Sequence, residues 1–315
     1  MSADDLKKIW GGGKKEASAY SGVYVPHIAK IVDEQARLAG YEWAGPSQGT
    51  VQNAEEVSKN PTHLAVGQLD ILKQVLGTPI PGGQGNYRFT ILHEDIGPEC
   101  LYLLTKEKGY KTLGHVIGNA WDLEVATAGP KSGSFGTWQG LVKIYPDLKD
   151  VKVKHLSGNG EIISAVKNAK VPTVGFFVMR PDPSSKVFID IDNANLTLVP
   201  VVDLELEGKY TFKKLKVAAG GFASKPTYHN TACTSVALIT GDPKAVEGAE
   251  SRVQKRLQAT IERIAALDSK TLRPDISTWR DMFDSVVELA ANETRSLLNE
   301  SKLALQGLAK GHSKN

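Results

Sequence analysis

The sequence predicts an α/β protein of two units, each a mostly parallel sheet flanked by helices, followed by long C-terminal helices. Three observations predict it. Residues 6–76 alternate between short apolar runs typical of strands and segments with helical spacing, and a second alternation of this kind begins at Leu123. From about residue 244 the apolar residues keep helical spacing only. A chain of 315 residues is long enough to bury two separate cores.

In the first alternation, a predicted helix follows most of the predicted strands. The first strand is expected at 6–10, and a helix begins near Tyr24, where Pro26 has an N1-like position, and stops at Gly40. The elements expected next are a strand at 41–44, a helix at 50–60, a strand at 64–66, a helix at 69–76, and strands at 87–93 and 99–105. Alternation of this kind is typical of a parallel sheet with helices on its faces.

The second alternation opens with a strand at 123–127 and a glycine-rich loop at 129–137 that leads into a helix. The elements expected next are a strand at 151–155, a helix at 161–168 capped by Asn159, a strand at 174–179, a helix at 184–191, and strands at 196–202, 210–217 and 233–240. Two helices are expected to follow, at 246–264 and 277–307.

The order of these elements predicts that the chain visits the second unit and then returns to the first. We expect lobe I to comprise 1–107 and 206–315, and lobe II to comprise 108–205. The strands near 99–105 and 196–203 would then be the crossovers. Because ligands of open α/β sheets bind beyond the carboxyl ends of strands, a ligand cleft between the lobes is expected.

The charge pattern argues against nucleic acid as a partner. The net charge of +3 comes from 38 basic and 35 acidic residues that are spread along the chain without a dense basic stripe. No apolar run approaches the ~20 residues of a membrane span. The N-terminal Met-Ser-Ala-Asp-Asp lacks the pattern of a secretory signal. A cytoplasmic protein and an exported protein whose signal has been removed are both compatible with this composition.

The two cysteines, Cys100 and Cys233, do not form a C-x-x-C motif, and no H-x-x-x-H or H-E-x-x-H motif occurs. Neither a metal nor another cofactor is therefore expected. Both cysteines lie in strand-like runs, so two buried free thiols are one interpretation. A single disulfide is the other, if the protein is exported.

The first candidate site is the segment that joins the strand at 41–44 to the next helix. It contains Ser47, Gln48, Gly49, Thr50 and Asn53. The first turn of a helix has unpaired N–H groups and the positive end of the helix dipole, which together favour an anion. Gly49 would allow a ligand to approach the backbone, and Ser47 or Thr50 could cap the helix.

The second candidate site, Gln68 with Asp70, lies at the corresponding end of the strand at 64–66. An amide directly after an apolar strand would face the expected cleft, whereas Asp70 could simply cap the next helix. The third candidate site lies in the glycine-rich loop and comprises Ser132, Gly133, Ser134, Gly136 and Thr137. Hydroxyl groups and glycines at a strand-to-helix turn are typical of a nest that binds an anion. The loop is neither a P-loop nor a G-x-G-x-x-G fingerprint.

A serine hydrolase is the alternative from another functional class. Gly45-Pro-Ser47-Gln-Gly49 fits the G-x-S-x-G elbow, and Asp203 and His229 follow in the chain order that such enzymes use. The elbow, however, follows only the second expected strand, whereas this enzyme class has more of the sheet before it.

Three segments together resemble the TAXI family of TRAP-transporter solute-binding proteins, which are type II periplasmic binding proteins. They are Gly-Thr-Val-Gln-Asn (49–53), Leu-Ala-Val-Gly-Gln-Leu-Asp (64–70) and Ser-Gly-Ser-Phe-Gly-Thr (132–137). The segment from Gly11 to Ala29 is also similar to the opening strand, loop and helix of the family. The resemblance covers roughly residues 6–240, and the tail after about 244 is longer than the family pattern predicts.

The resemblance implies a two-lobed, non-enzymatic receptor that closes by hinge motion around a small carboxylate, such as an amino acid, a dicarboxylate or an oxo-acid. It implies a periplasmic location and delivery of the solute to the integral-membrane subunits of a TRAP transporter. The ligand loops of the family correspond to Ser47–Thr50 and Asn53, to Gln68 with Asp70, and to Ser132–Thr137, and Tyr20 corresponds to an aromatic contact. A cytoplasmic sensor domain of the same fold remains a further alternative.

Overall fold

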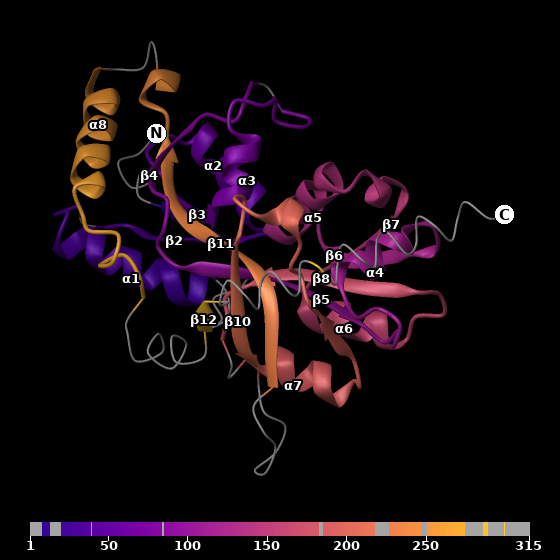
Figure 1. Cartoon of the computed structure of the whole chain (residues 1–315). Coiled ribbons are helices and arrows are strands. Elements are labelled where there is room, and N and C mark those ends of the chain that lie inside the picture. The colour runs from indigo at the N-terminus through magenta and orange to yellow at the C-terminus, as the bar shows by residue number, and fades with distance from the viewer. Residues whose placement is uncertain are drawn as a thin grey trace. The chain divides into compact units, whose positions relative to one another are not determined.

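Figure 1 shows a computed structural model of the chain. The chain comprises two compact units. Unit 1 comprises Met1–Pro98, Lys131–Gly133 and Ser235–Trp279, and unit 2 comprises Glu99–Pro130, Ser134–Thr234 and Arg280–Asn315. The structure describes residues 8–12, 20–38, 40–83, 85–182, 185–217, 227–246, 251–274, 286–288 and 299. The main crossings between the units lie at 98/99 and 234/235. The predicted lobe boundaries at 107/108 and 205/206 stay a prediction.

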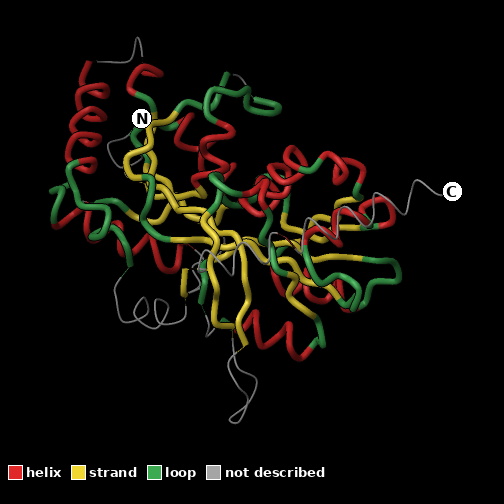
Figure 2. Tube along the Cα trace, viewed as in Figure 1, coloured by secondary structure: helices red, strands yellow, loops and turns green. Residues whose placement is uncertain are grey.

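Unit 1 is an α/β unit with a mixed sheet. Its elements are β1 (Lys8–Gly12), α1 (Tyr20–Glu34), β2 (Glu42–Ser47), α2 (Thr50–Lys59), β3 (Leu64–Gln68), α3 (Leu69–Val75), β4 (Phe89–His93), the second half of β11 (Thr227–Gly241), the short helix η5 (Pro243–Val246) and α8 (Ser251–Ala265). β1 lies between β2 and β3 and is parallel to both, whereas β11 is antiparallel to β3 and β4. Figure 2 distinguishes these strands from the helices.

The centre of this sheet explains where α2 begins. All five residues of β3 are buried, because the strand pairs on both edges and α2 packs against it. Ala54 and Val57 of α2 are fully buried in the core that contains Ala65 of β3. A continuous apolar strand of this kind is typical of a parallel sheet covered by helices. The polar residues that follow β2 and β3 therefore emerge at the carboxyl edge of the sheet.

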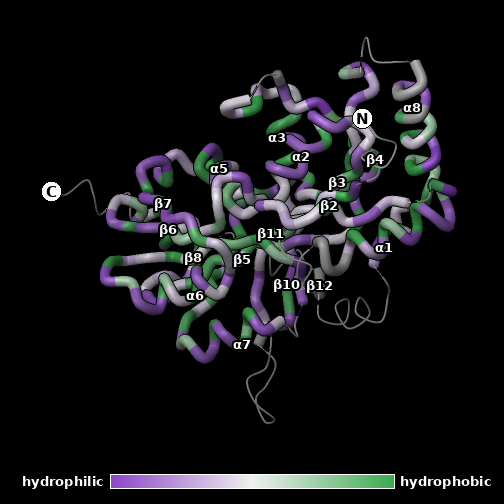
Figure 3. Tube along the Cα trace, turned by 180° about the vertical axis from the view of Figure 1, so that it is seen from behind, coloured by the Kyte–Doolittle hydropathy of each residue, from purple (hydrophilic) through white to green (hydrophobic). Residues whose placement is uncertain are grey.

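Unit 2 has a second sheet with apolar cores on both faces. Its elements are β5 (Pro98–Thr105), α4 (Leu113–Gly118), η2 (Ala120–Asp122), β6 (Glu124–Ala128), α5 (Gly133–Ile144), η3 (Pro146–Asp150), β7 (Lys152–Leu156), α6 (Asn159–Lys167), β8 (Thr173–Met179), α7 (Lys186–Asn193), β9 (Thr197–Val199), η4 (Leu204–Leu206), β10 (Thr211–Val217), the first half of β11, and β12 (Val286–Glu288). β6 lies parallel to β7 and β8, and β5 is antiparallel to β8 and β9. The central strands are strongly hydrophobic in Figure 3.

Consecutive residues of these strands belong to opposite faces. Val125 and Phe176 pack with Trp138 of α5 in one cluster, whereas Ala126 and Phe177 pack in another cluster with residues of α6 and α7. This follows from the two-residue period of a strand. The alternation of strands and helices in both units confirms the predicted α/β class.

The two cysteines form a disulfide, Cys100–Cys233, between β5 and β11. Both residues are buried, and 133 positions separate them in the sequence. Of the two interpretations that the sequence left open, the structure therefore supports the bridge.

Several predicted element boundaries were wrong. α1 begins at Tyr20, so Pro26 lies inside the helix and not at its start. Gly158 is the N-cap of α6, and Asn159 is its first helical residue, so Asn159 does not cap it. Residues 243–246 form a short 3-10 helix, and α8 starts only at Ser251.

The predicted second C-terminal helix, 277–307, is wrong at Val286–Glu288. These residues form β12, which pairs antiparallel with β10. The backbone pairing with β10 outweighs the local helical periodicity there. Apart from β12 and residue 299, this predicted helix lies outside the described residues from 275 onward. None of the described helices combines the length and apolar character that crossing a bilayer requires.

Candidate ligand-binding site

The turn from β2 into α2 is built around Gly49. Gly49 is the N-cap of α2 and has φ 129° and ψ −154°, a conformation that residues other than glycine rarely adopt. No side chain caps this helix, so the prediction that Ser47 or Thr50 would do so is wrong. The reason is that both hydroxyl groups interact with neighbouring strands instead.

Ser47 and Asn53 brace the turn against the ends of the neighbouring strands. The Ser47 hydroxyl lies 3.0 Å from the Gly11 carbonyl oxygen and 2.7 Å from Asn53 Oδ1. The fully buried Asn53 donates its amide N–H to the Val66 carbonyl oxygen at 2.9 Å. β1, β2 and β3 are thus fixed to the start of α2 by two side chains. Gln48 is more peripheral, since its backbone N–H donates to Gln52 Oε1 at 2.8 Å in an exposed position.

The segment Lys131–Gly133 lies against this same turn. A β-carbon built at Gly49 would be 3.1 Å from the Gly133 nitrogen and 3.2 Å from Ser132 Cα. The Gln52 N–H, in the first turn of α2, donates to the Lys131 carbonyl oxygen at 3.3 Å. The first and third candidate segments, 79 or more positions apart in the sequence, therefore meet within unit 1 at residues 49 and 131–133.

Gln68 joins this contact from the end of β3. Its backbone N–H donates to Thr50 Oγ1 at 3.1 Å, and both residues are almost fully buried. A β-carbon at Gly133 would lie 1.9 Å from Gln68 Oε1 and 2.9 Å from Thr50 Oγ1. Only glycine at position 133 leaves room for the Gln68 side chain in this position. The site thus brings together Gly49, Thr50, Gln68 and Ser132–Gly133.

The other predicted site residues, Asp70, Ser134, Thr137 and Tyr20, belong to α3, α5 and α1. Gln68 is the N-cap of α3, so Asp70 stands in the first turn and is not the cap. Ser134 and Thr137 belong to unit 2, where the Ser134 hydroxyl accepts a hydrogen bond from the Val178 N–H at 3.0 Å and Thr137 is fully buried. Tyr20 is the first residue of α1, and its side chain lies outside the described part of the chain. Their role in ligand binding stays a prediction.

Sequence reasoning missed a charged cluster beside this site. The buried Glu55 carboxylate of α2 lies 2.7 Å from Lys131 Nζ and 2.5 Å from Lys59 Nζ. Burial acts to raise the pKa of Glu55, but hydrogen bonds and charges from Lys131 and Lys59 outweigh it and hold the pKa below its ordinary value. The i, i+4 spacing could have indicated the Glu55–Lys59 pair. Nothing in the sequence indicates Lys131, because 76 positions separate it from Glu55.

The geometry gives the hydrolase alternative no support. The Asp203 carboxylate accepts a hydrogen bond from the Glu205 N–H at 3.0 Å and interacts with Tyr145. His229 Nε2 has no hydrogen-bond partner among the described residues, and the ring stacks on Tyr102 with 5.9 Å between centroids. Asp203 and His229 therefore do not form the acid–histidine pair in which the acid orients the base of a serine hydrolase.

The buried His229 predicts a pH dependence of stability. Burial lowers the pKa of His229 from 6.5 to about 4, so between these values the unfolded chain binds a proton that the folded chain does not. The free energy of unfolding should then fall as the pH drops below 6.5, by up to about 1.4 kcal/mol per pH unit from this group. Urea unfolding at pH 7, 6 and 5 should show a shallower fall for His229→Phe, which keeps the stacking. If the free energy of unfolding falls equally with pH in the wild type and in His229→Phe, His229 is not the source of this pH dependence.

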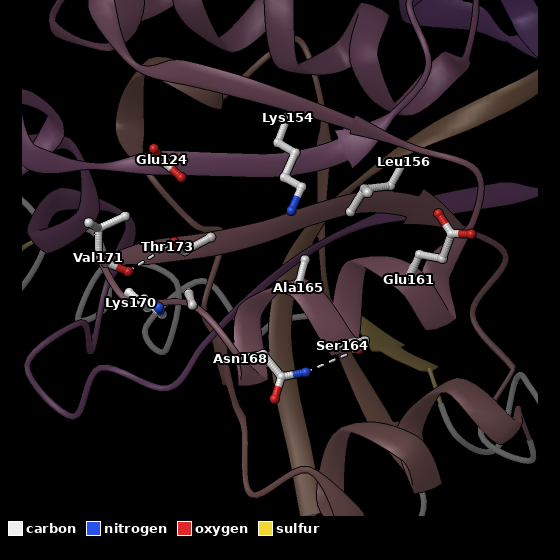
Figure 4. Close-up of a pocket in the computed structure, with 11 residues that line it drawn as sticks. Glu124, Lys154, Leu156, Glu161, Ser164, Ala165, Asn168, Lys170, Val171 and Thr173 are labelled. Carbon is white, nitrogen blue, oxygen red and sulfur yellow. Dashed lines mark hydrogen bonds between the residues drawn. The ribbon is translucent and has the colours of Figure 1, made fainter.

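A groove of about 570 Å³ lies in unit 2, and none of the predicted site residues lines it (Figure 4). It is lined by β7 and α6, with Lys154, Leu156, Glu161 and Ser164, and by Glu124 and Thr173. Glu124 and Thr173 are the first residues of β6 and β8. Leu156 is the last residue of β7, so the groove reaches from the amino ends of β6 and β8 to the carboxyl end of β7. It therefore differs from the usual ligand site of an α/β sheet, which lies beyond the carboxyl ends of the strands. Among the described residues, no group of His, Cys, Asp and Glu could hold a metal ion.

No known family model matches this sequence, and no curated protein matches it. Solved structures of similar fold include malate-bound MatC from Rhodopseudomonas palustris, with 15% identity, 96% of this chain and 97% of that chain covered, and a TM-score of 0.47. ATP-bound XAC2383 from Xanthomonas citri has 10% identity, coverage of 96% and 98%, and a TM-score of 0.46.

The CA3427 gene product of Candida albicans, described as having the generic periplasmic binding protein fold, has 10% identity, coverage of 96% and 94%, and a TM-score of 0.46. At these values the likenesses carry no argument about ligand or mechanism. The elements of the chain make it a mixed α/β protein. Its structural neighbours include proteins of the periplasmic binding protein fold.

Proposed function

We propose that this protein is a non-enzymatic receptor for a small organic carboxylate, bound at the start of α2. The observation that carries the proposal is the convergence of Gly49, Gln68 and Ser132–Gly133 on the first turn of this helix. Backbone N–H groups and the helix dipole favour a negative charge at such a position. Glycines at 49 and 133 allow residues 131–133 and the Gln68 side chain to approach this first turn closely.

The receptor interpretation also agrees with the sequence resemblance to the TAXI family. That resemblance covers the same three segments that meet at Gly49. The hinge closure, the ligand cleft and the delivery to TRAP-transporter subunits that it implies remain predictions. Ser134, Thr137 and Asp70 are proposed as further ligand contacts on the sequence pattern and the resemblance, and Tyr20 on the resemblance alone.

An extracytoplasmic location forms part of the proposal. Disulfides persist in oxidising compartments and are rare in the cytosol. The buried Cys100–Cys233 bridge therefore favours an exported receptor over a cytoplasmic sensor of the same fold. Secretion of the protein by its native host, shown by cell fractionation, would test this point directly.

A ligand screen tests the proposed function. A ligand at 100 times its dissociation constant stabilises the folded state by about 2.7 kcal/mol, which raises the melting temperature by a readily measured amount. We expect at least one of succinate, malate, 2-oxoglutarate and glutamate to raise it, and the corresponding amides to have a smaller effect. Calorimetry should then give a dissociation constant with one site. If none of these carboxylates binds, the proposed function is wrong.

A further inference from the structure

Lys131 stands at the edge of the proposed carboxylate site. Its carbonyl oxygen accepts the Gln52 N–H from the first turn of α2, and the next residue, Ser132, lies against Gly49. The Lys131 side chain is 42% exposed and so remains accessible to a solute. It therefore combines a fixed backbone position beside the site with a side chain that can still contact a ligand.

The charge of Lys131 is only partly balanced. Its partner Glu55 is shared with Lys59, so two ammonium groups face a single carboxylate whose side chain is 8% exposed. Glu56 also interacts electrostatically with Lys59, so Lys59 has a second acidic neighbour, whereas Glu55 is the carboxylate that pairs with Lys131. A buried carboxylate between two lysines stays ionised, which the lowered pKa of Glu55 also indicates.

The ammonium group can reach the start of the helix. Glu55 lies five residues beyond Thr50, or about 7.5 Å along the axis of α2. The Lys131 backbone is fixed near Gln52, between these two points. Because lysine carries its charge on a flexible four-carbon stem, rotation about its side-chain bonds can move the charge from Glu55 toward the first turn.

We propose that Lys131 is the residue that makes the site select anions. When a ligand binds, its carboxylate replaces Glu55 as the ion-pair partner of the Lys131 ammonium group. Glu55 then holds the lysine beside the site when no ligand is bound and keeps Lys59 as its own partner afterwards. This inference rests on the proposed function and names a residue that the sequence resemblance does not include.

Calorimetry tests the inference with two ligands, succinate and succinamate, which differ by one negative charge. The variants to be measured are Lys131→Met, Lys131→Arg, Lys59→Met and Glu55→Gln. Lys131→Met should weaken succinate binding at least tenfold and succinamate binding less, whereas Lys131→Arg should restore most of it. Lys59→Met is the matched control, because it removes the other lysine on Glu55 and the same charge. It should change succinate binding by less than about threefold, in line with an exposed ion pair.

Glu55→Gln separates a charge role from a structural one. If Lys131 binds the ligand, this variant should bind succinate as tightly as the wild type or more tightly, because the lysine no longer has a competing partner. If the ion pair only anchors residues 131–133, Glu55→Gln should weaken binding as much as Lys131→Met does, which would overturn the inference. Equal succinate affinities of Lys131→Met and Lys59→Met would also overturn it, while leaving the proposed function intact. A wild-type protein that binds neither succinate nor any other carboxylate of the screen would overturn both.

Discussion

Replacing Cys100 and Cys233 together with serine is expected to lower the free energy of unfolding by about 2–5 kcal/mol. The physical reason is that the bridge closes a loop of 133 positions, and a loop of this length loses about 5 kcal/mol of chain entropy in the unfolded state in the entropic model. Because typical domains are stable by only about 5–15 kcal/mol, this is a large fraction of the total. Urea unfolding of the oxidised wild type and the double variant measures it.

The reduced wild type provides the control for this prediction. Reduction removes the bridge without changing either side chain to serine, so it should reproduce most of the loss. Because the two sulfur atoms are bonded to each other, a thiol reagent should detect no free thiol in the oxidised protein even after unfolding. Two thiols titrating in the unreduced, unfolded protein would contradict the bridge and its predicted contribution.

Gly49→Ala is expected to lower both the stability of the protein and its affinity for a carboxylate. An alanine there must keep φ near 129°, and its β-carbon would press on the backbone of Ser132 and Gly133 at 3.1–3.2 Å. We expect a loss of stability of about 1–3 kcal/mol from the backbone strain. Because the contact with residues 131–133 must open, carboxylate affinity should fall at least tenfold. Thermal unfolding and calorimetry with a carboxylate found in the screen measure the two effects.

Gly45→Ala is the matched control for the backbone strain. Gly45 lies four residues earlier in β2 and has φ 124°, but a β-carbon there would meet no atom within 4 Å. It should lose stability through backbone strain alone and keep its carboxylate affinity. If both alanine variants bind the carboxylate as the wild type does, the contact between Gly49 and residues 131–133 does not form part of the binding site.

The sequence predicted most elements of unit 1 for a clear physical reason. Apolar runs such as 64–66 end at polar residues and glycine, and these local signals place β3 and the start of α2 within two residues of their observed positions. Capping was predicted less well. The hydroxyl groups of Ser47 and Thr50 were expected to bond the helix N–H groups, but Ser47 interacts with Gly11 and Asn53, and Thr50 with Gln68.

Features that depend on contacts between distant parts of the chain could not be predicted from the sequence. Val286–Glu288 has an apolar spacing compatible with a helix, but pairs with β10 as a strand. The cysteines illustrate the same limit. Their strand-like surroundings were visible in the sequence, whereas the register that brings Cys100 of β5 to Cys233 of β11 was not.

By itself, the sequence determined the α/β class, the alternation of strands and helices, and the three polar segments that merit attention as a site, because each of these depends on neighbours within a few residues. Only the tertiary structure decided that Gly49, Gln68 and Ser132–Gly133 meet, and that Lys131 shares Glu55 with Lys59. Such contacts join positions many residues apart, and their geometry follows from how the sheet packs against its helices. No local pattern of side chains encodes that packing.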